Sequence, residues 1–441
     1  MRTNRNRRLM TGVAGLSISA LALTACGPDT TGETAETEDT DFTDVEPADS
    51  ITFWTNHPGG SQDVESELIE GFTEETGIEV DVVTAGANYE EVSQRFQTAQ
   101  GTGDVGDVVI LSDATWFPNY LNGSLAPVDE ALETADVDTS GYHEALFADY
   151  DYEGSHYGAP YARSTPLFYY NTEHYEEAGL DEAPETWDEV TEHSEALMDA
   201  EVASSAFVFP PEEQYPAWTM SNLVWAYGGS WSEEWDFSPV SSEETVEALE
   251  YAQEAAQEWA MVGSGDPADD FSAGAASQMV ASTGSLAGVL ETADFEVGVG
   301  FLPGGPAGDG ETPTGGAGMS IASESSPEEQ LAAAMFIGHM TNPDSTATFS
   351  EAVGYMPVHR DADMSAVYEE TPQFEVAVDQ LQERARVQDN SRVFLPGGDL
   401  ALSQMLQRIL TSDVDVAEET AALEEEFEGL YERDLATELE E

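Results

Sequence analysis

The segment "ITFWTN" (51–56) opens the pattern that decides the fold of this chain. Its β-branched and aromatic residues predict a strand. The stretch "DVESELIEGFTEETG" (63–77) carries apolar residues at helical spacing and ends at a glycine. A second strand is predicted at "IEVDVV" (78–83), a second helix at "NYEEVSQRFQTAQGTG" (88–103) and a buried third strand at "GDVVIL" (106–111). This β-α-β-α-β order predicts an α/β lobe with a mainly parallel sheet.

Polar residues follow each of the three predicted strands. They are Asn56 and His57 after the first strand, residues 85–89 after the second and residues 112–115 after the third. Because ligands bind beyond the carboxyl ends of strands in such sheets, we expect a binding site there. A globular part of about 390 residues is too long for a single core, so we expect a second lobe, beginning near "PYARSTPLFYYN" (160–171).

The N-terminus has the form of a bacterial lipoprotein signal. A basic stretch, "MRTNRNRRLM", precedes the apolar run "GVAGLSISALALTAC" (12–26), which is too short to span a membrane. The run ends in "LTAC", an apolar residue and two small residues before Cys26, which is the only cysteine. We expect Cys26 to carry a lipid and to anchor the chain at the outer face of the cell membrane. An ordinary cleaved signal with an incidental cysteine is the alternative.

The chain is strongly acidic. It has 12 arginines, no lysine and 89 acidic residues; four of the arginines precede residue 10, so a mature chain keeps eight and carries a formal charge of −81. Residues 27–49 are rich in Thr, Glu and Asp and predict a disordered tether. Such a charge repels nucleic acid and anionic membranes. We interpret it as adaptation to high salt, which screens the repulsion.

Motifs for catalysis and metal binding are missing from the sequence. It has no GxSxG, HExxH, P-loop or GxGxxG pattern, and its seven histidines show no metal-ligand spacing. The stretch "DVDTSG" (136–141) starts like a calcium loop, but Phe147 stands where the loop needs glutamate. We therefore expect no enzyme activity, cofactor or metal. A secreted hydrolase stays open only if paired carboxylates meet in a cleft at glycosidase distances.

Several motifs resemble family 1 solute-binding proteins of ABC importers, in the same order and spacing across about residues 50–435. They are "ITFWTNHPG" (51–59), "GANYEEVSQRF" (86–96), "PYARSTPLFYYNTEHYEEAGLDEAPETWDEV" (160–190), "ASTGSLAGVLETADFEVGVGFLP" (281–303), "TGGAGMSI" (314–321) and "EAVGYMPV" (351–358). The chain is most similar to the glycerol-3-phosphate-binding branch of that family, which belongs to Ugp importers.

The resemblance implies a set of ligand residues: Tyr89, Asp113, Ser164, Ser282, Gly316 and Tyr355. Asp113 falls where the family has a carboxylate for the glycerol hydroxyls. Two family tryptophans fall near Tyr215 and Trp218, so one ring is kept and one is changed. A phosphate-binding arginine of the family falls in "NSRVFLPGGD" (390–399), where an ungapped match gives Phe394 and a shift of two residues gives Arg392.

These residue types suit a glycerophosphate for physical reasons. Tyrosine and serine hydroxyls donate to phosphate without adding charge, and glycine lets the backbone approach a ligand. A carboxylate accepts from hydroxyls, and arginine offers phosphate a bidentate fork. Arg163 directly precedes Ser164 and is expected either to reach a bound anion or to form an ion pair between lobes. The alternatives are that the tyrosines are core or cap residues, that the serines and Gly316 form turns, and that Trp218 packs between helices.

Together these observations predict an α/β, two-lobe fold of the periplasmic-binding-protein type II class, with the ligand between the lobes. The expected parts are a signal peptide (1–25), an acidic tether (26–49), lobe one (50–159 and 298–352), lobe two (160–297 and 353–430) and an acidic tail (431–441). We expect a monomer that captures glycerol-3-phosphate or a glycerophosphodiester such as glycerophosphocholine and delivers it to an ABC permease. A neutral sugar or oligosaccharide is the alternative ligand.

Overall fold

The segment 51–111 folds in the predicted order. Its elements in the computed structural model are β1 Ser50–Thr55, α1 Gln62–Thr76, β2 Glu79–Thr84, α2 Tyr89–Ala99 and β3 Val108–Ser112. The three strands run parallel and lie in the order β2-β1-β3, which confirms the α/β prediction. The structure describes residues 40–103, 105–437 and 439, all within one compact unit of the chain. The expected signal peptide and Cys26 lie outside the described residues.

Local signals in the sequence set the ends of these helices. Before α2, the Asn88 side chain accepts a hydrogen bond from the Glu91 amide at 2.9 Å, which satisfies a donor that the first turn leaves free. After α1, Gly77 adopts a left-handed conformation with φ of 79°, which ends the helix. The first turn of α2 therefore begins at Tyr89, immediately beyond the strand end where the site was expected.

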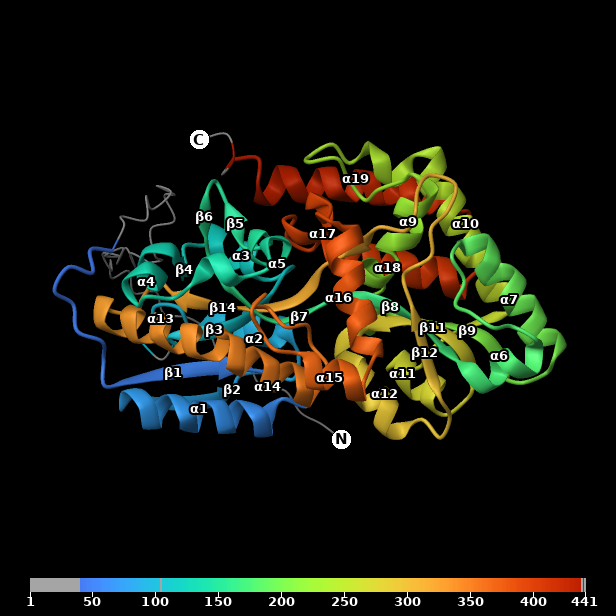
Figure 1. Ribbon diagram of the computed structural model, residues 1–441. Coiled ribbons are helices and arrows are strands. Elements are labelled where there is room, and N and C mark those ends of the chain that lie inside the picture. Colours follow the sequence, from blue (N-terminus) through green and yellow to red (C-terminus); the bar gives the residue numbers. More distant parts are fainter. Residues whose placement is uncertain (1–39, 104, 438, 440–441) are drawn as a thin grey trace, which may run out of the picture. The chain divides into compact units, whose positions relative to one another are not determined.

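Three further strands complete the first sheet. They are β14 Gly315–Ala322, β4 Leu125–Ala126 and β7 Ala159–Ser164. The long strand β14 runs antiparallel to β3 and also pairs with β4 and β7, so a segment 200 residues downstream of β3 closes the sheet. Helices α13 Pro327–Thr341 and α14 Pro343–Val353 belong to this half, and α13 packs against β1 and β14 (Figure 1).

The second sheet has the order β10-β9-β11-β8-β12. Its strands are β8 Pro166–Asn171, β9 Ser205–Phe209, β10 Ala260–Val262, β11 Ala276–Ser282 and β12 Val297–Gly300. Helices on this half are α6 Thr172–Ala178, α7 Trp187–Asp199, α8 Pro216–Thr219, α9 Ser221–Tyr227, α10 Glu243–Glu258, α11 Pro267–Ser272 and α12 Leu286–Thr292. Two sheets, each with its own helices, give the two-lobe α/β arrangement that was predicted (Figure 1).

The chain crosses between the two halves of the fold three times. Strand β7 stays in the first sheet until Ser164, and β8 begins the second at Pro166, because the "RSTP" stretch turns the chain only at Thr165. Strand β12 still pairs with β8 at 297–300, so the second crossing falls within 301–314. The third crossing comes after Arg360, because the Met356 and Arg360 amides still donate to Arg163 and Gly141 in the first half, whereas helix α16 Gln373–Arg384 packs on β12.

The C-terminal helices pack mainly on the second half. They are α15 Ser365–Glu370, α16 Gln373–Arg384, α17 Asn390–Val393, α18 Gly398–Thr411 and α19 Val416–Asp434, and α18 packs on α8, α10 and α19. The remaining elements are α3 Trp116–Leu121, α4 Asp129–Thr134, α5 Glu144–Ala148, β5 Asp151–Tyr152, β6 Ser155–His156, the parallel pair β13 Thr312–Pro313 and β15 Ala385–Arg386, and five short 3₁₀ turns.

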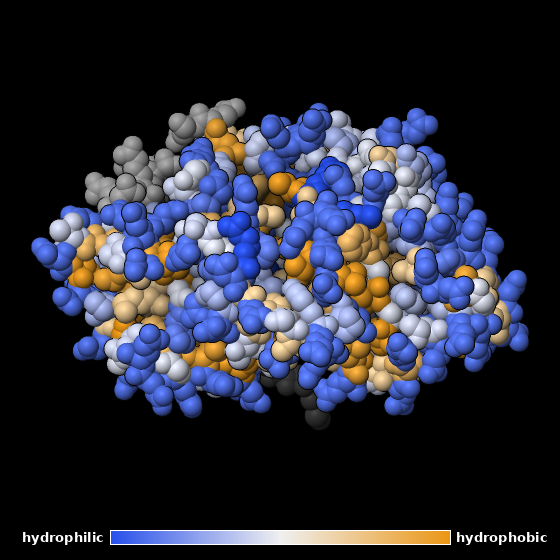
Figure 2. Space-filling model, viewed as in Figure 1, coloured by the Kyte–Doolittle hydropathy of each residue, from blue (hydrophilic) through white to orange (hydrophobic). Residues whose placement is uncertain are grey.

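Hydrophilic side chains cover most of the face shown in Figure 2, and apolar side chains appear there in smaller patches. The apolar residues of β1, β3 and β14 are buried instead, as are those of β8, β9 and β11. Among the described residues, no helix is both long enough and apolar enough to cross a membrane.

Candidate functional site

A cavity of about 470 Å³ opens where the two halves of the fold meet. Its size falls within the range of small-molecule sites in proteins. The first half contributes residues that follow β2 and β3 and the start of β14, as expected for an α/β sheet. The second half contributes α8, α11, α12 and the end of β11, and the C-terminal segment adds residues from α17 and α18.

All the ligand residues expected from the sequence line this cavity, except Arg163. They are Tyr89, Asp113, Ser164, Tyr215, Trp218, Ser282, Gly316, Tyr355 and Arg392. They come from eight separate stretches of the chain, so only the tertiary fold brings them together. Their part in binding stays a prediction.

The backbone around Gly316 explains why a glycine stands there. Its φ is 96°, and a Cβ atom at this position would lie 2.1 Å from the carbonyl oxygen of Ala162 in the paired strand β7. No residue with a side chain fits this close approach. The Gly316 carbonyl accepts from the Asp113 amide at 3.0 Å, which fixes Asp113 at the end of β3.

Trp218 forms part of the wall and is itself held by the first half. Its ring packs on Gly315, where a Cβ would lie 2.5 Å from the ring, and its indole N–H donates to the Thr314 carbonyl at 2.9 Å. The ring is therefore fixed by its neighbours and offers a flat surface to the cavity. Near it, Ser282 accepts from the Gly284 amide at 3.0 Å, which leaves the serine hydroxyl proton free to donate.

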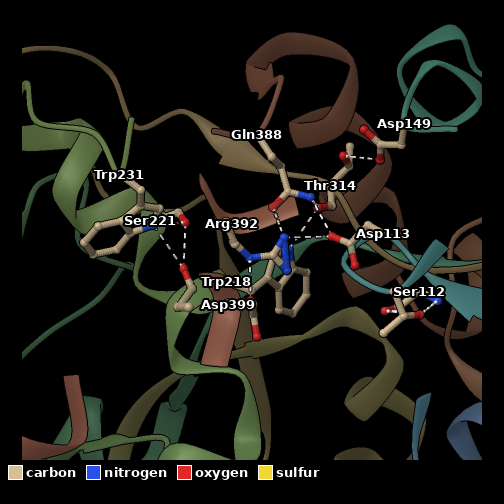
Figure 3. Close-up of polar contacts among 12 residues, drawn as sticks. Ser112, Asp113, Asp149, Trp218, Ser221, Trp231, Thr314, Gln388, Arg392 and Asp399 are labelled. Atoms are coloured by element: carbon tan, nitrogen blue, oxygen red, sulfur yellow. Dashed lines mark hydrogen bonds and ion pairs between the residues drawn. The ribbon is translucent and has the colours of Figure 1, made fainter. Parts of the chain in front are cut away.

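Arg392 lies at the centre of a buried polar cluster (Figure 3). Its Nη1 donates to Asp113 Oδ2 at 2.9 Å and to Gln388 Oε1. Gln388 in turn donates to Asp113 Oδ2 and to the Thr314 carbonyl, each at 2.6 Å. The guanidinium and the carboxylate that were expected to meet different parts of a ligand thus contact each other.

Asp399, the second residue of α18, faces Arg392 from the other side. Its Oδ1 lies 3.1 Å from Arg392 Nε, but the two groups are not aligned for a hydrogen bond. Both atoms are buried and lack a hydrogen-bond partner among the described residues. Buried polar groups in proteins are nearly always hydrogen-bonded, so these two point to a ligand or water at this place.

The cavity is more acidic than the sequence analysis expected. Besides Asp113, it is lined by Glu90, Asp266, Asp269 and Asp399, and Arg392 is the one arginine among the described lining residues. Burial raises the pKa of Glu90, and Asp399 and Asp113 raise it further. Burial likewise raises the pKa of Asp399, which Arg392 partly offsets. The carboxyl groups therefore disfavour one another's charge.

Two tyrosines supply neutral donors at the first-half wall. The hydroxyl oxygens of Tyr89 and Tyr355 lie 3.4 Å apart, and both side chains are buried. Burial raises the pKa of each phenol above its ordinary value. Both hydroxyls stay protonated at physiological pH and can donate to an anion without adding charge.

Arg163 does not take the place that was expected for it. Its side chain is fully buried away from the cavity lining, its Nη2 pairs with Asp149, and its Nη1 donates to the Tyr150 hydroxyl at 2.9 Å. Asp149 also accepts from the Thr314 hydroxyl at 2.6 Å. Asp149 precedes β7 and packs in the first half, so the pair joins neighbouring elements and neither reaches the cavity nor spans the lobes.

Sequence reasoning missed several residues of the site. Glu90 lies inside the quoted motif "GANYEEVSQRF" (86–96), but as one acid among 89 it gave no reason to be chosen. Gln388 lies two residues before the quoted stretch 390–399 and Asp399 is its last residue, but no pattern nominated either of them. Gln388 contacts Asp113, 275 residues away, and Asp399 contacts Arg392; the sequence shows neither contact.

Comparisons with known proteins agree with this fold. A family model described as "Bacterial extracellular solute-binding protein" matches residues 67–376. The sn-glycerol-3-phosphate-binding periplasmic protein UgpB of Pectobacterium atrosepticum is 24% identical over 383 residues, which cover 82% of this chain and 80% of that protein.

Solved structures give two further similarities. UgpB from Mycobacterium tuberculosis in complex with glycerophosphocholine is 38% identical, with a TM-score of 0.83, over 87% of this chain and 98% of that one. The GacH receptor of Streptomyces glaucescens, also solved with acarbose, has a TM-score of 0.75 at 20% identity over 87% and 98% of the two chains and shows the fold alone. The chain therefore belongs to the bacterial extracellular solute-binding protein family, and within it the chain is similar to UgpB.

Proposed function

We propose that this protein captures a glycerophosphodiester with a cationic head group and delivers it to the permease of an ABC importer. Glycerophosphocholine is the first candidate. The observation that carries the proposal is the charge of the cavity, where Arg392 is the one arginine among the described lining residues and five carboxyl groups share the lining with it. The similarity to a UgpB solved with glycerophosphocholine supports the same ligand class.

Electrostatics favours a diester over a monoester. A phosphate monoester carries close to two negative charges at neutral pH, and the carboxyls around Arg392 would repel both. A phosphodiester carries one negative charge, and in glycerophosphocholine a quaternary ammonium balances it. The guanidinium of Arg392 only partly offsets the raised pKa values of Glu90 and Asp399. A second cation nearby would stabilise the ionised form of both carboxyl groups.

Each part of such a ligand has a partner of suitable chemistry in the cavity. Arg392 offers a charged donor to the phosphate, and Asp113 accepts from the glycerol hydroxyls while it stays paired with Arg392. The tyrosine hydroxyls donate to the remaining phosphate oxygens. The flat ring of Trp218 covers the carbon chain or the ammonium, for which an aromatic face is a good partner.

Binding between two lobes also provides the signal for delivery. A ligand that contacts both lobes favours the form in which they are closed on it. The permease would recognise that form. We propose that crossings at Thr165, within 301–314 and after Arg360 separate the two lobes, and that the protein acts as a monomer without catalysis.

The proposed place of action is the outer face of the cell membrane. Cys26, outside the described residues, would carry the lipid, and the acidic residues after it would act as a tether that ends before Phe42, which is buried in the core of the first half and corrects the expected tether bound of 49. The family to which the chain belongs is extracellular.

A neutral sugar is the second candidate, because carboxylates and an aromatic ring also suit a polyol. Calorimetric titration in molar salt separates the two with glycerophosphocholine, glycerol-3-phosphate and maltose as ligands. We expect glycerophosphocholine to bind at least tenfold more tightly than glycerol-3-phosphate and maltose not to bind. Tight maltose binding without binding of either phosphate would overturn the proposal in favour of the sugar.

A further inference from the structure

Glu65 is a buried carboxyl group that the proposed ligand site does not use. It lies on α1, where the other buried side chains, Val64, Leu68, Ile69 and Phe72, are apolar. The Glu65 side chain is 0% exposed and does not line the cavity. Burial of a carboxyl group costs folding free energy unless the group is paired. The partners of Glu65 therefore indicate which parts of the fold it holds in place.

Three side chains from two segments of the chain, 55–57 and β7, converge on Glu65. His57 Nδ1 lies 2.6 Å from Glu65 Oε2. The hydroxyls of Thr55 at the end of β1 and of Tyr161 in β7 donate to Oε1 at 3.2 and 3.3 Å. Both carboxyl oxygens are therefore occupied, and two of the partners lead to the cavity wall.

The first route runs through His57 and the turn that follows it. His57 has a φ of 53°, which is uncommon for a residue with a side chain, and its amide donates to the Thr55 hydroxyl at 2.9 Å. The turn Pro58–Gly60 comes next, and Gly59 lines the cavity. A Cβ on Gly59 would lie 2.8 Å from the Tyr355 ring, so the turn and the ring are in close contact.

The second route runs through aromatic rings. The Tyr161 ring packs on Phe349, with centroids 4.6 Å apart, and Phe349 stacks on Tyr355 at 6.1 Å and 22°. Tyr355 lines the cavity beside Tyr89. Both routes from Glu65 therefore end at Tyr355, one through the turn that carries Gly59 and the other through Phe349.

We infer that Glu65 is a positioning residue that holds the wall formed by Gly59 and Tyr355 in its binding shape. It does this by fixing His57 and Tyr161 from behind, without touching the ligand. The inference rests on the proposed function in so far as glycerophosphocholine is used as the probe. It predicts that a change at Glu65 alters both the shape of the ligand-free wall and the affinity.

The test compares Glu65→Gln with Glu67→Gln, an exposed acid on the same helix, in the full chain and in molar salt. In the ligand-free protein, the NMR signals of the Gly59 amide and the Tyr355 ring should shift in Glu65→Gln and stay in place in Glu67→Gln. For glycerophosphocholine, Glu65→Gln should bind at least tenfold more weakly by calorimetry, and Glu67→Gln should bind within twofold of wild type.

A second variant tests the same contact if Glu65→Gln does not fold. His57→Gln breaks the contact at its more exposed partner, since the His57 side chain is 13% exposed and the Glu65 side chain 0%. This variant should shift the same two signals. Unmoved Gly59 and Tyr355 signals, or an affinity within twofold of wild type, would overturn the inference. If wild type does not bind glycerophosphocholine at all, the proposed function fails, and the ligand-free signals still decide the role of Glu65.

Discussion

Replacement of Arg392 by alanine tests the charge argument directly. The variant removes the only arginine among the described residues of the cavity wall and its contacts with Asp113, Gln388 and Asp399. A hydrogen bond to a charged group contributes about 1.5–3 kcal/mol. If Arg392 makes one such bond to phosphate, the affinity for glycerophosphocholine should fall by about 10- to 150-fold.

The same change should destabilise the free protein. Without Arg392, Asp113 and Asp399 face each other unpaired, and loss of one partner of a buried ion pair costs about 3–5 kcal/mol. Calorimetric titration must therefore be run below the melting temperature that a thermal scan of the variant gives. Arg392→Lys keeps the charge but lacks the fork that contacts both Asp113 and Asp399, so its affinity should lie between those of wild type and alanine.

Arg408→Ala is the matched control. Arg408 lies on α18, its side chain is 47% exposed, and it pairs with Glu419 at 2.7 Å. An exposed pair contributes about 0–1 kcal/mol, so this variant should bind like wild type. If Arg392→Ala binds glycerophosphocholine within twofold of wild type while folded, Arg392 does not hold the phosphate and the charge argument for the ligand is wrong.

The other predictions concern Asp113, salt, pH and the anchor. Asp113→Asn should weaken binding of glycerophosphocholine by about 10- to 100-fold in calorimetry, because a charged acceptor for hydroxyls is lost; equal affinity would remove Asp113 from the site. The melting temperature should rise markedly from low to molar KCl, since salt screens a formal charge of −77; a flat response would contradict this. Burial raises the pKa of Asp389 and Asp399, so the folded chain binds more protons than the unfolded chain, and stability in molar salt should rise as pH falls from 7 toward about 4.5; a fall in melting temperature over that range would refute it. Wild-type protein should partition into detergent and Cys26→Ser should not; equal release of both would exclude the lipid anchor.

Much of the first half of the fold was predictable because its signals are local. The strand and helix patterns between residues 51 and 111 need only neighbours in sequence, and an asparagine and a glycine mark the helix ends. The position of β14 was not predictable in this way, since its pairing with β3 joins segments 200 residues apart. The ends of β7 and β12 were not predictable for the same reason, because their partners are distant strands.

The candidate site also contains residues that local motifs predict and residues that only long-range contacts identify. Positions such as Asp113 and Gly316 could be nominated because they stand in recognisable motifs. The partners of the two interior arginines could not be nominated. Asp149 and Asp399 are two acids among 89, and only the fold sets the first beside Arg163 and the second beside Arg392. In so acidic a chain, the sequence does not distinguish the few carboxyl groups that pair with an arginine from the many that do not.

The existing contacts of Arg392 reduce the free energy that a ligand gains when its phosphate binds there. A phosphate that approaches Arg392 meets a guanidinium already contacted by Asp113 and Gln388, with Asp399 at 3.1 Å. The gain on binding is therefore the difference between the contact with phosphate and the contacts that it weakens. A ligand that brings its own cation reduces this loss, because the carboxyls that share Arg392 gain a second partner. A purely anionic ligand of the same size has no such compensation. The cavity should accordingly discriminate by the net charge of the ligand more strongly than by its size.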